Sequence, residues 1–213
     1  MQPFILSYSD QPPSGTCQVF NNLNGSNPPI TIQGPLDAGA QVTLQGPNGA
    51  KNASLSSGQL NATVSATGNY LTPGAYTVSA PGGKDVSTFS ASITIPASAT
   101  LTSPPLDAAS PVSVTRSNGL TVTWSGSQAG YIQIEVFGAT DNTFTTGADV
   151  QCNAPAAAGS FTIPPSVLLA LPAGNFGQLA FRPFANPANL TGSGLNFSKL
   201  LAWSEFVTPL AFK

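Results

Sequence analysis

Apolar and polar residues alternate along most of this chain, and stretches with helical periodicity are few. The stretch "QVTLQG" from Gln41 places two aliphatic side chains on one face of an extended segment, and "AYTVSA" from Ala75 also has two apolar residues on one face. The stretch from Phe89 to Ile95 sets four apolar residues on one face. A period of two is typical of strands that bury one face. The pattern therefore predicts β-sheets and little helix.

The segment "GGKD" from Gly82 interrupts this alternation with two glycines and two charged residues. A phosphate-binding loop would need a following helix whose N-terminus meets the anion. The residues that follow, "VSTFSASITIP", are strand-like, so "GGKD" is predicted to be the turn of a β-hairpin. Val86 has the opposite parity to Phe89, so either Val86 lies in the loop or a β-bulge shifts the register.

The most legible pair of strands lies in "GLTVTWSGSQAGYIQIEVFG" from Gly119. Alternate apolar residues ending at Trp124 share one side of the first strand, and Ile132, Ile134 and Val136 share one side of the second. "LTVTWS" followed by "YIQIEVF" resembles strands B and C of fibronectin type III and related immunoglobulin-like modules of bacterial secreted or surface proteins. The resemblance places Trp124 at the core tryptophan. It implies a scaffold suited to adhesion, with no catalytic residue.

Farther along, "AGSFTIPPSVLLALPAGNFGQLAFRPFA" is predicted to form a strand, a helical turn that begins at Pro165, and a strand through Leu179. The segment "LLAWSEFVTPLAF" is predicted to be a strand that closes the second sheet, with Trp203 and Phe206 in the core. Strands at intervals of about 8 to 12 residues are typical of sandwiches or barrels.

The chain is predicted to divide near its middle. "PASATLTSPPLDAASP", residues 96 to 111, is rich in Pro, Ser and Ala and suits a connector. "PLDAGAQVTLQGPNG" from Pro35 and "PLDAASPVSVTRSNG" from Pro105 match at a constant offset, each as a strand between a Pro turn and an Asn-Gly turn. We therefore expect an all-β fold of two tandem immunoglobulin-like or fibronectin type III-like β-sandwich domains, residues 1–98 and 99–213.

Charge is scarce, and this limits the partners. Charged residues make up 7% of the chain, the net charge is −2, and the six basic residues are scattered. No basic stripe is available for phosphates, so nucleic acid is excluded as a partner. The longest apolar run, "VLLALPA" from Val167, is broken by a proline, so no membrane span is expected. No signal peptide is visible at the start, but the hydroxyl-rich, charge-poor composition favours an extracellular or cell-surface location.

Few residues suggest catalysis. The chain has no histidine, which excludes Ser-His-Asp and Cys-His arrangements. Glu135 and Glu205 could form a carboxylate pair of the glycosidase type, but solvated surface carboxylates are the favoured interpretation. Asp141, Asn142 and Asp149 could bind calcium, but an ordinary polar loop is favoured. We expect no cofactor, no metal and no enzyme activity.

Cys17 and Cys152 leave two interpretations open. They form a disulfide, or they are buried thiols that behave as small apolar residues. A bridge is expected to link the two domains, and closing so long a loop would stabilise the fold by roughly 4 to 5 kcal/mol. A zinc site is not expected, because two sulfurs without histidine provide too few ligands.

These observations favour a non-catalytic structural or adhesive module of a secreted or cell-surface bacterial protein. Edge strands without charge lack the residues that normally block pairing between chains, so self-association or another protein partner is expected. The alternative is a carbohydrate-binding accessory module, with Tyr70, Tyr131 or Trp203 as rings that stack on a glycan. A hydrolase that uses carboxylates alone is the third and least favoured interpretation.

Overall fold

The computed structural model describes residues 11–20, 36–56, 59–61, 70–106, 110–126, 129–142, 146–194 and 199–213. The described part is all-β, as predicted, and its one α-helix is the single turn α1 (Pro165–Leu168). Its strands belong to two compact units, which we call unit 1 and unit 2. Unit 1 contains β1, β7 to β13 and β16, whereas unit 2 contains β2 to β6, β14 and β15.

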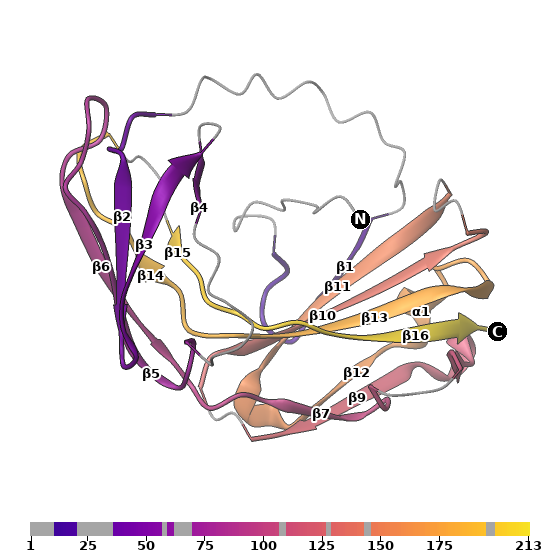
Figure 1. The fold of residues 1–213 in the computed structure, drawn as a ribbon. Coiled ribbons are helices and arrows are strands. Elements are labelled where there is room, and N and C mark those ends of the chain that lie inside the picture. Colours follow the sequence, from indigo (N-terminus) through magenta and orange to yellow (C-terminus); the bar gives the residue numbers. More distant parts are fainter. Residues whose placement is uncertain are drawn as a thin grey trace. The chain divides into compact units, whose positions relative to one another are not determined.

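Unit 1 consists of two sheets that enclose one core (Figure 1). Sheet A has six strands and sheet C has three. Neighbouring strands are antiparallel except for β16 and β8, which run parallel. In spatial order, the strands of sheet A are β1 (Cys17–Phe20), β11 (Gly147–Pro155), β10 (Tyr131–Ala139), β13 (Gly174–Phe184), β16 (Phe206–Phe212) and β8 (Val112–Val114). Those of sheet C are β12 (Ser160–Ile163), β9 (Leu120–Ser125) and β7 (Thr100–Ser103).

The core of unit 1 comes from alternate residues of both sheets. Trp124 of β9 and Phe181 of β13 face each other with ring centroids 5.8 Å apart. The Trp124 indole is buried, and its Nε1–H donates to the carbonyl oxygen of Ala156 at 2.7 Å, which satisfies its polar atom. The predicted strands at 120–125 and 131–137 and the core position of Trp124 are therefore confirmed.

The predicted connector at residues 96–111 is wrong in part, because it contains a strand of sheet C. In β7, Leu101 lies opposite Trp124 of β9 and is buried in the core. The short strand is flanked by Ser, Thr and Pro, and one buried leucine is too little periodicity to indicate a strand. The predicted closing strand β16 is confirmed, but it is not the sheet edge, because β8 pairs beyond it.

Unit 2 contains the five-stranded antiparallel sheet B and a two-stranded hairpin. Side chains of β6 alternate as predicted, with Phe89, Ala91 and Ile93 buried and the residues between them exposed. In spatial order, the strands of sheet B are β4 (Gln59–Asn61), β3 (Gly49–Ser56), β2 (Gln41–Gly46), β5 (Gly74–Ala80) and β6 (Phe89–Ile95). The hairpin pairs β14 (Ala188–Asn189) with β15 (Lys199–Leu200).

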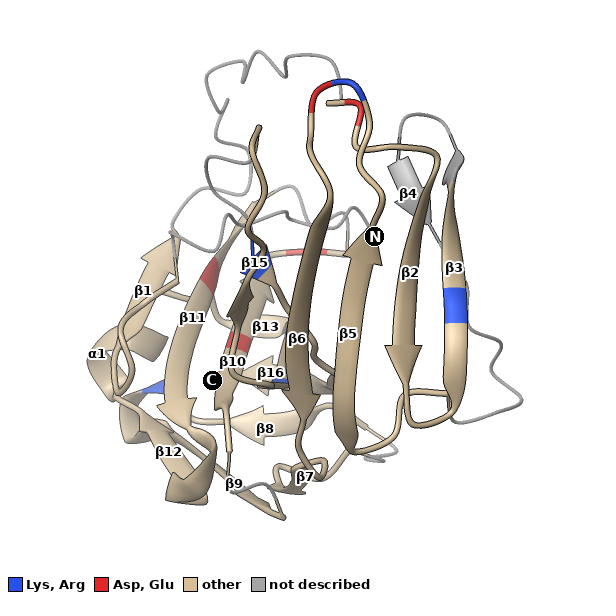
Figure 2. Cartoon of the chain, turned by 90° about the vertical axis from the view of Figure 1, so that its left-hand side faces the viewer, with Lys and Arg blue, Asp and Glu red and all other residues tan. Residues whose placement is uncertain are grey.

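"GGKD" lies in the loop of the hairpin formed by β5 and β6, as predicted. Val86 belongs to this loop and is buried, and its carbonyl oxygen accepts from the Gly83 N–H at 2.8 Å. A Cβ at Gly83 would lie 2.3 Å from Oδ1 of Asp37, so this close approach requires glycine. Asp37 and its neighbours hold the loop through hydrogen bonds, including a 2.9 Å bond from the Asp37 N–H to Oδ2 of Asp85. Acidic and basic residues gather at this end of the hairpin (Figure 2).

The two matching segments contain β2 and β8 at corresponding places. Each segment ends at a glycine with positive φ, 91° at Gly49 and 77° at Gly119. The two strands nevertheless belong to different units. Unit 1 includes β1, from before residue 98, and unit 2 includes β14 and β15, from after it. The domains 1–98 and 99–213 stay a prediction.

Candidate functional site

The face of sheet A that points away from the core carries a row of aromatic side chains and a group of charged side chains. Ile132 and Ile134 of β10 point into the core. Because side chains alternate along a strand, Tyr131, Gln133 and Glu135 lie on the opposite side. We call this side the outer face. The neighbouring strands place their own outward residues in register with these three.

An aromatic row crosses the outer face. Tyr131 lies opposite Phe184 of β13, and their rings stack with centroids 4.8 Å apart at an interplanar angle of 7°. Phe184 bridges to Trp203, and these two rings stack at 5.4 Å and 19°. Phe184 is buried, whereas Trp203 is 55% exposed. The row therefore ends in an indole ring that is supported from behind and open to solvent.

The prediction that Trp203 belongs to the core is wrong. Trp203 and Phe206 have opposite parity, and Phe206 is the one that packs against the core of unit 1. Tyr131 and Trp203 thus belong to one row. Tyr70 does not join it, because it lies in unit 2, where it is buried edge-on against Tyr76 with its hydroxyl 2.9 Å from the carbonyl oxygen of Leu44.

A charged row runs beside the aromatic row, centred on Arg182 two residues before Phe184. The Arg182 guanidinium donates through Nε to Oε2 of Glu205 at 2.5 Å and through Nη1 to the carboxylate of Glu135. It also donates to Oε1 of Gln133 at 3.2 Å. Burial lowers the pKa of Arg182, but the two carboxylates outweigh this effect, and the pKa is raised. The arginine is therefore charged at any physiological pH.

Glu135 and Glu205, predicted to be solvated surface carboxylates, both pair with the same arginine, and their side chains are 21% and 41% exposed. Sequence reasoning missed Arg182. The available signal was parity: Arg182 is displaced by one residue from the apolar Phe181, as Glu135 is from Ile134 and Glu205 is from Phe206. Both acids are held as ion pairs by the one arginine, so the arrangement fits a fixed polar surface better than acid-base chemistry.

The outer face of β11 adds a strip of buried acceptors. Oδ1 of Asp149, Oε1 of Gln151 and Oδ1 of Asn153 are buried without a hydrogen bond. Burial, assisted by the charge of Glu135, raises the pKa of Asp149 to about 7. Asp149 lies in strand β11, so the polar loop predicted for Asp141, Asn142 and Asp149 is wrong for Asp149. Among the described residues, no group of three or more potential metal-ligating acids or cysteines is found.

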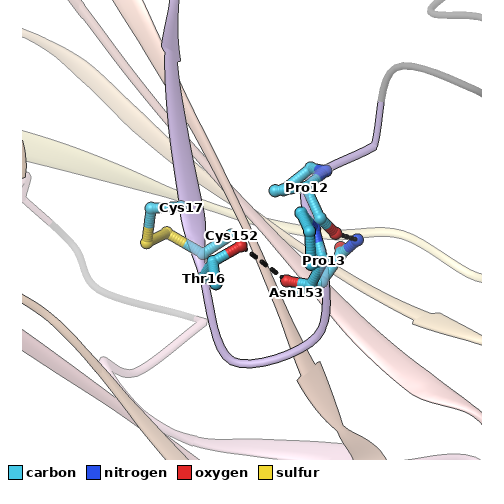
Figure 3. The surroundings of a disulfide bond; sticks show 6 residues. All are labelled: Pro12, Pro13, Thr16, Cys17, Cys152 and Asn153. Atoms are coloured by element: carbon cyan, nitrogen blue, oxygen red, sulfur yellow. Dashed lines mark hydrogen bonds between the residues drawn. A yellow bond between two sulfur atoms is a disulfide. The ribbon is translucent and has the colours of Figure 1, made fainter.

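The disulfide between Cys17 and Cys152 fixes β1 to β11 (Figure 3). The two residues lie opposite each other in register with their Cα atoms 4.1 Å apart, which brings their side chains within reach. Backbone bonds from the Gly15 N–H to the Asn153 oxygen and from the Asn153 N–H to the Thr16 oxygen flank the bridge. The bridge joins two strands of sheet A within unit 1, so it does not link unit 1 to unit 2, although its two cysteines lie on either side of the predicted boundary at residue 98.

Unit 1 also has a surface hollow of about 410 Å³, lined by Arg116, Thr140 and Leu169 among others. The Arg116 guanidinium already donates through Nη1 to the carbonyl oxygen of Leu171 at 2.5 Å. The Thr140 hydroxyl donates to the carbonyl oxygen of Thr146. These polar groups serve the fold, and the outer face of sheet A remains the stronger candidate.

Comparisons with known proteins do not add to this description. The chain matches no protein-family model, no curated protein and no solved structure. Within the described ranges, no helix has the length and apolar character needed to cross a membrane.

Proposed function

We propose that this chain is a non-catalytic structural or adhesive module of a secreted or cell-surface bacterial protein, and that it associates through strand edges. The observation that carries the proposal is the absence of charge on the edge strands of sheets A, B and C. Natural sheets commonly protect their edges with lysine or other charges, and uncharged edges can pair with another chain. The edge strands without Lys, Arg, Asp or Glu are β1, β8, β4, β6, β7 and β12.

β6 is the best candidate for such pairing. With seven residues it is the longest of these edge strands, and it pairs with β5 along its whole length. On its other side, the described residues form one isolated bridge, Ser90 to Thr191. β14 and β15 also contact β6. The backbone groups of β6 that Thr191 does not pair are the ones proposed to bind a strand from another chain.

The fibronectin type III-like or immunoglobulin-like scaffold is part of this proposal for unit 1. β9 and β10, the strands that resemble B and C, lie in different sheets around one core, as the resemblance implies. Trp124 lies in that core. In unit 2 a single larger sheet offers no comparable support for a second such sandwich.

A matched pair of lysine substitutions tests the association. Thr77 of β5 and Ser92 of β6 lie opposite each other and share a hydroxyl hydrogen bond of 2.9 Å. Thr77→Lys and Ser92→Lys therefore lose the same bond and add the same charge, one on an interior strand and one on an edge. We expect wild type and Thr77→Lys to associate with rising concentration in light scattering, and Ser92→Lys to remain monomeric. A monomeric wild type at all concentrations would refute the proposal.

A second candidate function is a carbohydrate-binding accessory module. The exposed indole of Trp203 at the end of a stacked row favours it, because flat and rigid aromatic surfaces suit the apolar face of a sugar ring. Binding to glycans is compatible with an adhesive role, and the two candidates use different surfaces of the chain.

A further inference from the structure

We infer that the exposed end of the outer face of sheet A binds a neutral saccharide, with one pyranose ring stacked on Trp203 and its hydroxyl groups bonded beside Glu205. This inference rests on the second candidate function above and gives it a site and a ligand class. The two residues lie two positions apart just before β16, and both contact outer-face residues of β13: Trp203 stacks on Phe184 and Glu205 pairs with Arg182.

The indole is organised for stacking before any ligand arrives. Phe184 lies against one side of the Trp203 ring at 5.4 Å, and Tyr131 lies behind Phe184 at 4.8 Å. This support limits the ring's rotation, so binding loses little side-chain entropy. The indole remains 55% exposed. A ligand with a flat apolar face can cover it without a rearrangement of the sheet.

Hydrogen-bonding groups lie directly beside the indole. The Glu205 side chain is 41% exposed, and its Oε2 accepts from Nε of Arg182 at 2.5 Å. That bond fixes the carboxylate and leaves Oε1 to accept from a ligand hydroxyl. Arg182 acts here as a positioning residue, because its guanidinium is already held by Glu135, Glu205 and Gln133. A stacking ring next to a fixed acceptor matches a sugar, which has an apolar face and a polar rim.

The charge and size of the surface select this ligand over others. The fixed carboxylates of Glu205 and Glu135 share one arginine, so the surface does not attract an anionic polysaccharide or a phosphate. A stable protein interface buries about 800 Å² per partner and usually surrounds its aromatic anchor with apolar residues. Trp203 is instead followed by Ser204 and Glu205. A neutral polysaccharide carries no charge for the carboxylates to repel, and its hydroxyl groups suit the polar residues beside Trp203.

Affinity gel electrophoresis with three soluble probes tests the site: a mixed-linkage β-glucan, an α-glucan and a galactomannan. We expect at least one probe to retard the wild-type chain. Trp203→Ala should weaken that binding at least tenfold, and Trp203→Tyr should recover part of it. Phe176→Ala removes another exposed ring, on β13, and should leave binding unchanged. Glu205→Gln keeps the shape but weakens the acceptor, and should reduce affinity several-fold.

Tryptophan emission provides a second readout that separates binding from misfolding. Trp124 is buried, so a change of emission on adding the probe reports Trp203. Retardation by none of the three probes, or equal weakening by Trp203→Ala and Phe176→Ala, would overturn the inference. Loss of association in Ser92→Lys with intact probe binding would separate this site from the edge-pairing proposal. Association without probe binding would refute the saccharide site and leave edge pairing standing.

Discussion

Units 1 and 2 are built from the same alternating pattern, but they bury very different amounts of it. Among the described residues of unit 1, twenty buried apolar residues, most of them from the two sheets, form one cluster. In unit 2, the described residues form two clusters of four and three buried residues on and around sheet B. A strand pattern gives each sheet one apolar face, and only a second layer can cover that face fully. Within the described residues, the number of sheets that cover the core, and not the alternating pattern, therefore accounts for the difference in burial between the two units.

The units also differ in where they hold their charges. In unit 2, Asp37 and Asp85 lie at the exposed end of the hairpin formed by β5 and β6, where backbone N–H groups bond both carboxylates. In unit 1, Asp149 and Glu135 lie on a sheet face, and Asp149 is largely buried. A carboxylate in water with N–H donors is stabilised, whereas a buried one is penalised. An ionised aspartate therefore stabilises the fold of unit 2 at Asp37 and destabilises the fold of unit 1 at Asp149.

The largest expected effect comes from core truncation in each unit. Phe181→Ala removes a fully buried ring from the large cluster and should lower the free energy of unfolding of unit 1 by about 3 to 5 kcal/mol. Phe89→Ala should cost unit 2 less, about 3 kcal/mol at most, because its cluster has only three buried residues among those described. Both tryptophans lie in unit 1, so urea unfolding followed by tryptophan emission and by circular dichroism separates the units. Equal losses would break the comparison.

The disulfide should sharpen the same contrast. Replacing both Cys17 and Cys152 with serine frees a loop of 135 residues and should destabilise unit 1 by about 2 to 5 kcal/mol. The unfolding midpoint of unit 2 should not change, because both cysteines lie in unit 1. Denaturation with and without a reducing agent provides the measurement, and the double variant, which has no thiol, serves as its control. A loss confined to unit 2 would contradict the assignment of the bridge.

The smallest effect, with opposite signs in the two units, comes from pH. Burial raises the pKa of Asp149 to about 7, so the folded chain binds more protons than the unfolded chain between about pH 4 and 7, and stability falls across this window. Asp149→Asn should gain stability relative to wild type as pH rises from 4 to 8. The Gly39 N–H and the Lys84 backbone lower the pKa of Asp37, so Asp37 stabilises above its ordinary pKa. Asp37→Asn should therefore lose stability at neutral pH.

Urea titrations at intervals between pH 4 and 8 measure both differences. The two variants remove the same charge, so each serves as the control for the other. A parallel pH dependence in both variants would show that net charge, and not local environment, sets the response. Divergent curves would support the contrast between a buried carboxylate in unit 1 and an exposed one in unit 2.

Local features of the fold were predictable from the sequence. Alternation located the hairpin of β5 and β6, and it identified β9 and β10 and the inward side of Trp124. The short helix after Pro164 was also predicted, because Pro at the first helical position is favourable. These elements depend on residues within one turn or one strand, which is the range over which a sequence pattern carries information.

The partners of each strand were not predictable. Alternation says which side of β16 faces the core, but it does not say that β8 lies beside it in parallel. The pairing of β1 with β11 links residues that are far apart in sequence, so the sequence alone left both a disulfide and two buried thiols open. For the candidate site, parity separates Trp203 from Phe206, but the stacking of Trp203 on Phe184 depends on register between distant segments.

The interior position of β16 has a consequence for biosynthesis. Sheet A stays open between β13 and β8 until residues 206–212 leave the ribosome. The apolar side chains of β10 and β13 therefore stay incompletely covered until β16 pairs with β13. Sheet B spans residues 41–95 and can assemble from consecutive hairpins while translation continues. The need for chaperones should accordingly be greatest while most of unit 1 has been synthesised and β16 is still inside the exit tunnel.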